Sequence, residues 1–119
     1  MPIVTIHTNH SVDSPQRERL LNDVAAATGT ALAIDKARVD VSLHILPPDA
    51  TLTAGVFQGP FVRFAIKMFV GRNLEIKQNL VQSYNDIAQQ FFAGTNSDIK
   101  TVIHELERDE LAFGSAFSD

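Results

Sequence analysis

The chain begins Met1-Pro2-Ile3-Val4-Thr5-Ile6-His7, and this stretch decides how the rest is interpreted. Residues 2–8 are predicted to form a strand, because β-branched residues dominate them. If Met1 is removed, the ring nitrogen of Pro2 becomes a free secondary amine, and such an amine at the start of a buried strand is able to act as a base near neutral pH. The alternative is that Pro2 only begins an edge strand, where its missing N–H costs little.

The composition indicates one globular domain spanning residues 1–119. The chain is 45% hydrophobic and 20% charged, as ordinary globular proteins are. Its net charge of -4 argues against nucleic-acid binding. We find no basic leader and no long apolar span, so we expect no membrane contact and, by default, a cytoplasmic location. There is no cysteine, so neither a disulfide nor thiolate chemistry is expected, and the four histidines lack metal-ligand spacing, so no metal site is expected.

The periodicity of apolar residues predicts four strands and two helices. Strands are expected at residues 2–8, 38–45, 61–69 and 99–105. The first helix is expected to begin with Ser14 as its cap and to end at Gly29. The second is expected to begin after Asn73 and to end at Gly94. The stretch at 51–60 is expected to be a connector, and the tail at 111–117 is apolar but short.

The two halves of the chain repeat the order strand, helix, strand. Residues 2–46 and 62–106 can be laid over one another at a constant offset of 60 without a gap, so that Leu20 falls on Leu80 and His44 on His104. This agreement predicts a duplicated βαβ unit with right-handed crossovers. The expected fold class is therefore α/β (α+β), with one four-stranded mixed sheet that carries both helices on one face.

The sheet face away from the helices is expected to be polar. Parallel strands are usually apolar on both faces, but these strands alternate. The residues expected on this face are Thr5, His7, Arg38, Asp40, Ser42, His44, Arg63, Lys67, Lys100 and His104. Such a face is either solvated or packed against copies of the chain. We favour an oligomer, because two helices leave half of the sheet uncovered.

The halves differ in the residues that carry charge. Arg72 and Lys100 stand where the first half has Val12 and Asp40, so the second half adds two cations, whereas Pro2 belongs to the first half. Cations near an amine disfavour its protonated form. They also bind a carboxylate substrate and stabilise the enolate that forms when a proton is removed beside a carbonyl. Taken singly, each cation is better explained as a solvated surface charge than as a functional residue.

The residues from Pro2 to His7 resemble the start of the tautomerase superfamily, typified by 4-oxalocrotonate tautomerase. The second half resembles the same short unit at residues 70–77, at 103–106 and at Gly114. In length, and in residues 61–75, the chain looks most like 5-carboxymethyl-2-hydroxymuconate isomerases. The resemblance covers nearly the whole chain and rests on the combination of these motifs with the doubled βαβ unit. It implies a homotrimer with sites where subunits or halves meet.

The resemblance also implies roles for particular residues. Pro2 falls on the processed N-terminal proline that is the family's general base, and Arg72 falls on the arginine before the helix. The second arginine of the short enzymes falls on Lys100, which keeps the charge but loses the bidentate fork. With a shift of two residues in the first half, Arg38 is an alternative to Lys100.

An aromatic residue lines the pocket of the short tautomerases. In this chain it falls on Leu111, with Phe113 two positions further on. The resemblance therefore implies that an apolar wall is retained in this region, with a shape that differs from that of the short enzymes.

Three functions are open at this point. The first is a cofactor-independent keto–enol tautomerase or isomerase that acts on a small 2-hydroxy-dienoate or enolpyruvate-like carboxylic acid, with Pro2 as the base. The second is haloacrylate dehalogenation with hydration, or malonate semialdehyde decarboxylation, in which a protonated proline acts as an acid and a carboxylate such as Asp40 or Glu105 activates water. The third is a non-enzymatic binding role, as in macrophage migration inhibitory factor.

Overall fold

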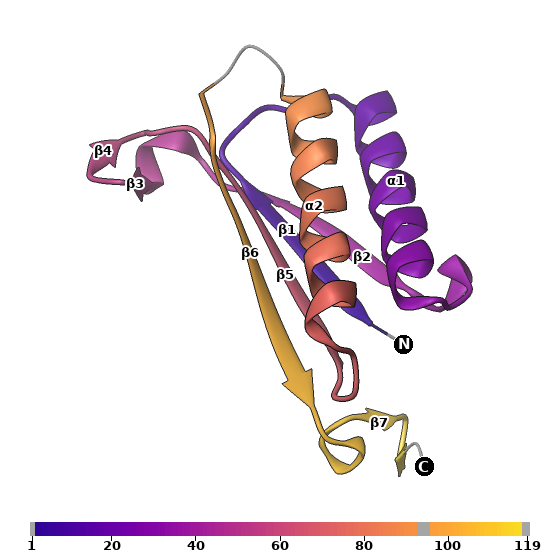
Figure 1. Cartoon of the computed structure of the whole chain (residues 1–119). Helices are drawn as coiled ribbons and strands as arrows, with labels where there is room; N and C mark the ends of the chain where they lie inside the picture. Colours follow the sequence, from indigo (N-terminus) through magenta and orange to yellow (C-terminus); the bar gives the residue numbers. More distant parts are fainter. Residues whose placement is uncertain (1, 93–95, 118–119) are drawn as a thin grey trace.

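The computed structural model describes residues 2–92 and 96–117, and it confirms the predicted architecture. Four strands form one sheet in the order β2-β1-β5-β6, and both helices lie side by side on one of its faces (Figure 1). Strand pairing is parallel within each half, between β1 and β2 and between β5 and β6, and antiparallel between the halves, where β1 meets β5. The main elements are β1 (Ile3–Thr8), α1 (Ser14–Leu32), β2 (Asp40–Ile45), β5 (Phe61–Phe69), α2 (Leu74–Phe91) and β6 (Asp98–Leu106).

The hydrophobic core lies between the helices and the sheet. Alternate residues of the two central strands face the helices, as a period of two requires. The largest fully buried side chains of this layer are Ile6, Leu20, Phe64, Ile66, Met68, Leu80 and Tyr84. Tyr84 stacks on Phe64, and its hydroxyl shares a 2.6 Å hydrogen bond with Thr28, so its polar end is satisfied inside the core. Burial raises the pKa of Tyr84 to about 12, and this tyrosine has a structural role.

The first helix begins and ends differently from the prediction. Its cap is Asp13, not Ser14, and the Asp13 carboxylate accepts a hydrogen bond of 3.1 Å from the Gln16 N–H. The helix continues through Gly29 to Leu32 and ends at Ala33, which is left-handed at φ 56°. A Cβ at Gly29 would lie 2.9 Å from the carbonyl oxygen of the following loop. This glycine therefore permits close packing and does not stop the helix.

The second helix begins as predicted, because Asn73 accepts a hydrogen bond of 3.0 Å from the Ile76 N–H. Its predicted end at Gly94 lies outside the described residues. Neither α1 nor α2, the helices of the described chain, is long and apolar enough to cross a membrane.

The predicted connector and tail each form a short hairpin. The elements are β3 (Leu52–Thr53) with β4 (Val56–Phe57), and β7 (Ala112–Phe113) with β8 (Ala116–Phe117). Each hairpin follows a 3₁₀ turn, η2 (Pro48–Ala50) or η3 (Arg108–Glu110), and the corresponding elements are 60 residues apart. The duplication therefore extends to Phe117. The hairpins project from opposite ends of the sheet (Figure 1) and expose Leu52, Phe57 and Phe117 by 60% or more.

The face of the sheet away from the helices is polar, as expected, with one correction. Arg38 lies in a 3₁₀ turn, η1 (Lys36–Arg38), before β2 and not on that face. The strand register aligns His44, His7, Arg63 and Lys100 in one row across all four strands. The rings of His7 and His44 stack with centroids 4.7 Å apart. The row therefore gathers basic side chains on the uncovered face.

The histidine stack makes stability depend on pH. Burial lowers the pKa of His7 below its usual 6.5, and the charges of His44 and Arg63 lower it further. The unfolded chain then binds a proton at a pH where folded His7 stays neutral. The stability contribution is therefore present above about pH 6.5 and is lost as the pH falls through that value towards the folded pKa.

We predict that His7→Gln reduces the fall in melting temperature between about pH 7.5 and about pH 5.5. The dependence should not vanish, because burial also lowers the pKa of His10. His44→Gln removes one neighbouring charge and should have a smaller effect in the same direction. A His7→Gln protein whose melting temperature falls as steeply as that of the wild type would contradict this interpretation.

Candidate active site

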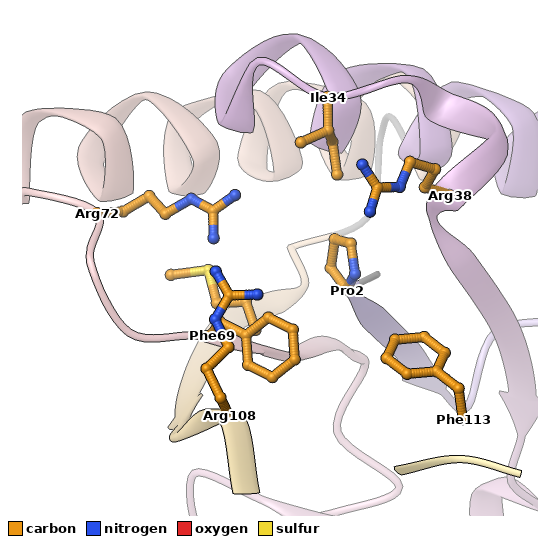
Figure 2. Close-up of a pocket in the computed structure, with 8 residues that line it drawn as sticks. Pro2, Ile34, Arg38, Phe69, Arg72, Arg108 and Phe113 are labelled. Atoms are coloured by element: carbon orange, nitrogen blue, oxygen red, sulfur yellow. The ribbon is translucent and has the colours of Figure 1, made fainter. Parts of the chain in front are cut away.

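Pro2 lies at the start of β1, where the two halves meet. Its carbonyl oxygen accepts a 3.0 Å hydrogen bond from the Asp40 N–H, and Ile3 pairs with Lys67 on β5. These contacts hold buried Pro2 beside the end of β5. A pocket of about 160 Å³ opens there (Figure 2), lined by Pro2, Ile34, Arg38, Met68, Phe69, Arg72, Arg108 and Phe113. Four of the six predicted site residues are therefore together: Pro2, Arg38, Arg72 and Phe113.

Arg72 is positioned by the turn between β5 and α2. Gly71 has φ 125°, which L side chains rarely adopt, and this conformation turns the chain sharply after β5. Asn73 then caps the helix. Arg72 is held between a glycine bend and a helix cap, and its guanidinium group points into the pocket (Figure 2).

Arg38 reaches the same pocket from η1, after the end of α1. Left-handed Ala33 reverses the chain, and the Asp35 carboxylate accepts a 2.9 Å hydrogen bond from the Ala37 N–H at the start of η1. In Figure 2 the Arg38 guanidinium group lies near Pro2, on the helix side of the pocket. Lys100 and Arg38 were the alternatives for the second arginine of the short tautomerases. In the fold of this chain, Arg38 is the one that lines the pocket with Pro2.

Arg108 was not predicted from the sequence. It begins η3, where the Glu107 N–H donates a 2.8 Å hydrogen bond to the Glu110 carboxylate in a capping box. Its guanidinium group lies 4.2 Å from the centre of the Phe69 ring. The 60-residue offset, extended past residue 106, sets Arg108 against Pro48. The contrast between halves that singled out Arg72 would therefore have found Arg108 too.

Lys100 lies away from this pocket in the described chain. It stands beside Arg63 in the basic row, and its Nζ is 3.1 Å from the Asp98 carboxylate. Leu111 is half-buried before β7 and is not among the lining residues, whereas Phe113 is. The proposed contacts of Lys100 and Leu111 with a substrate remain predictions that this single chain does not test.

The corresponding positions in the other half of the chain carry neither the proline nor the arginines of this pocket. The residues 60 positions from Pro2, Arg38, Arg72, Arg108 and Phe113 are Val62, Asp98, Val12, Pro48 and Thr53. No basic residue is among them. Val62, Asp98 and Thr53 line a hollow of about 10 Å³, together with Phe61, Arg63 and Lys100, and this is close to the space for one water molecule. A larger hollow of about 370 Å³ also includes Thr53 and Asp98 in its lining, but no arginine or lysine is among its described lining residues. The pocket at Pro2 differs in that three arginines line it.

The chemistry of the Pro2 pocket is that of an anion site with an apolar wall. Its described lining holds three guanidinium groups and no carboxylate, while Ile34, Met68, Phe69 and Phe113 supply the apolar surface. Guanidinium groups bind carboxylates bidentately. No cluster of three potential metal ligands occurs among the described residues. The arrangement is suited to holding a small organic acid against Pro2.

No protein-family model and no curated protein matches the sequence. Among solved structures, Pt0534 inactivated by 2-oxo-3-pentynoate superposes with a TM-score of 0.88 at 22% identity, covering 98% of this chain and 94% of that one. A symmetric trimer of wild-type fused 4-OT superposes with a TM-score of 0.88 at 16% identity, with the same coverage.

A third structure is the FG41 malonate semialdehyde decarboxylase inhibited by 3-bromopropiolate. It superposes with a TM-score of 0.76 at 22% identity, covering 94% of this chain and 88% of that one. All three belong to the tautomerase superfamily. The chain has the tautomerase fold. At these identities the likeness establishes the fold alone.

The glycine bend before Arg72 provides a test of the site's geometry. We predict that Gly71→Ala destabilises the protein by about 1–3 kcal/mol, because alanine is strained at this φ even though its Cβ meets no atom within 4 Å. The same change should weaken binding of a small carboxylate such as malonate, because it redirects Arg72.

Gly55→Ala is the matched control. Gly55 also has positive φ (78°) and open space around a Cβ, but it lies in the β3–β4 hairpin, outside the pocket. It should lower the melting temperature without weakening malonate binding, measured by calorimetry. Equal losses of malonate affinity in the two variants would show that Gly71 does not act through the pocket.

Proposed function

We propose that the protein is a cofactor-independent keto–enol tautomerase or isomerase of a small 2-hydroxy-dienoate or enolpyruvate-like carboxylic acid. In this proposal Met1 is removed and the Pro2 nitrogen is the general base. The observation that carries it is the placement of Pro2 in a pocket whose described lining has three arginines and no carboxylate.

The surroundings of Pro2 favour an unprotonated amine. An α-amino group ordinarily titrates at roughly 7.7–8.0, and a secondary amine is intrinsically more basic. Burial and nearby positive charges both disfavour the protonated form. Pro2 is buried, and Arg38, Arg72 and Arg108 line its pocket. A downward shift in the pKa of the amine would leave it able to accept a proton at neutral pH.

The reaction needs only a proton transfer. Arg38 and Arg72 bind the substrate carboxylate on the helix side of the pocket, and Ile34, Met68 and Phe113 contact the hydrocarbon part. The Pro2 nitrogen takes the proton of the enol hydroxyl group and returns it to carbon, so the enol becomes a ketone without any change of oxidation state. The negative charge that develops on oxygen is stabilised by the arginines.

Hydration of a haloacrylate is less well supported by the geometry, because it requires a carboxylate to activate water. Glu105 is paired with Lys77 of α2 at 2.5 Å, and Asp40 alternates onto the polar face of the sheet. Neither is among the lining residues of the pocket. Decarboxylation would be recognised by release of carbon dioxide, and hydration of a haloacrylate by release of halide.

A homotrimer is part of the proposal. It is supported by the uncovered polar sheet face and by two hairpins that expose apolar side chains. Several solved structures with this fold are trimers of fused 4-OT. In a trimer, a neighbouring copy would have the opportunity to contribute Lys100 or Leu111.

The test is to block the Pro2 nitrogen and follow ketonisation of phenylenolpyruvate by absorbance. We predict that a residue retained in front of Pro2 reduces the rate by at least about 10²-fold, because a positioned base typically contributes about 10²–10⁴-fold. Pro2→Ala, which leaves a primary amine, should reduce the rate less.

Light scattering on the same samples serves as the control for assembly. The blocked protein should keep the oligomeric state of the processed protein. Full activity with a blocked nitrogen would show that Pro2 is not the general base and only begins the strand. If the processed protein, with its amine free, turned over no member of a broad enol panel, a non-enzymatic binding role would be favoured instead.

A further inference from the structure

A row of basic side chains crosses the face of the sheet that the helices leave uncovered. The strand register aligns one residue from each strand, in the order His44, His7, Arg63 and Lys100. Because adjacent strands lie about 4.8 Å apart, the four groups stand side by side over about 15 Å. His7 is half-buried and the other three are exposed. None of the four lines the pocket at Pro2.

The carboxylates of the same face compensate one member of this row. The Nζ atom of Lys100 lies 3.1 Å from the Asp98 carboxylate. The other carboxylate of the face, Asp40, lies at the opposite end of β1, in a row with Ile3, Lys67 and His104. Within the described chain, Arg63 and the two histidines of the basic row therefore form no ion pair.

The side chains of the row leave their hydrogen-bond donors at the surface. The rings of His7 and His44 stack at an angle of 14°, and Ser42 Oγ lies 3.0 Å from His44 Nε2. Arg63 lies over the Phe61 ring at 5.0 Å, which uses the face of the guanidinium group and leaves the N–H groups at its edge. Burial, and then the charges of His44 and Arg63, lower the pKa of His7. These three groups are thus close enough to repel one another when protonated.

A tetrahedral dianion matches this arrangement. Its oxygens point in several directions, so they accept hydrogen bonds from side chains on neighbouring strands, and its two charges offset those of an arginine and a protonated histidine. The space beside the row is too small for an attached organic group. The hollow lined by Arg63 and Lys100 holds about 10 Å³, which is close to the space for one water molecule. The row therefore suits a free inorganic anion.

We propose that His7, His44 and Arg63 form a binding site for a free inorganic dianion of the phosphate or sulfate class on the uncovered face of the sheet. The inference does not depend on the proposed reaction, because this site shares no residue with the pocket at Pro2. A bound dianion favours the protonated histidines. It therefore stabilises the folded chain in the acidic range where the histidine stack alone loses stability.

Sulfate is the probe, because it remains a dianion in mild acid, so that any pH dependence reports on the protein. The melting temperature is measured in sodium sulfate and in sodium chloride at equal ionic strength, at about pH 5.5 and at about pH 7.5. Sulfate should raise the wild-type melting temperature more at the lower pH, where the histidines are protonated. A general salting-out effect would raise it equally at both pH values and in every variant, and that result would overturn the proposal.

Two variants and a matched control locate the site. Arg63→Gln and His7→Gln should each weaken sulfate binding about tenfold in calorimetry at the lower pH, as expected for losing a charged hydrogen bond. Lys67→Gln is the control, because Lys67 is an exposed cation of the same strand and the same face, outside the row. It should leave the affinity for sulfate nearly unchanged. An equal loss in Lys67→Gln would show diffuse attraction to the face and no site.

The same samples test two other occupants of the row. Glycerol phosphate should bind no more tightly than inorganic phosphate, and a clear preference for the ester would contradict the assignment to a free anion. Acidic side chains of a second copy of the chain are the other alternative. They would prevent sulfate from binding, and Arg63→Gln would then weaken the oligomer in light scattering. We expect sulfate to bind and the oligomer to survive in Arg63→Gln.

Discussion

The antiparallel pairing of β1 with β5 is the constraint on which the site depends. It is the junction between the two halves, and its register sets Ile3 opposite Lys67. A slip of one residue would turn every side chain of β1 to the other face and expose Val4 and Ile6, which are fully buried. Burial of these apolar side chains therefore fixes where Pro2 lies. The same register brings it to the end of β5, beside the turn that carries Arg72.

The duplicated fold has two equivalent ends, and the differences between them explain the chemistry. Both halves end in a 3₁₀ turn and a short hairpin, so each offers the same backbone positions. At one end these positions carry arginines and a proline at the second residue of the chain. At the other end the matching positions carry Val12, Pro48 and Val62. The backbone is thus shared, and the site depends on a few side chains.

The sequence predicted what depends on local periodicity, namely the sheet, its order of elements and the two covering helices. It did not predict β3 or β7, because a two-residue strand has no measurable period. Aligning residues with a family placed Arg72 and Arg38 at the pocket, but Lys100 lies in the basic row because β6 presents it beside Arg63. Arg108 was missed because the comparison of the two halves stopped at residue 106, although the same offset sets Arg108 against Pro48.

The central claim is that Pro2 carries a free amine whose pKa is lowered by the arginines around it. The most direct test is an NMR titration of protein labelled with ¹⁵N at proline, after its intact mass has shown that Met1 is absent. The account predicts an amine pKa below the ordinary range of roughly 7.7–8.0, and a rise in that pKa when Arg72 is replaced by glutamine. An amine that titrates at or above the ordinary range, or a mass that shows Met1 retained, would contradict it.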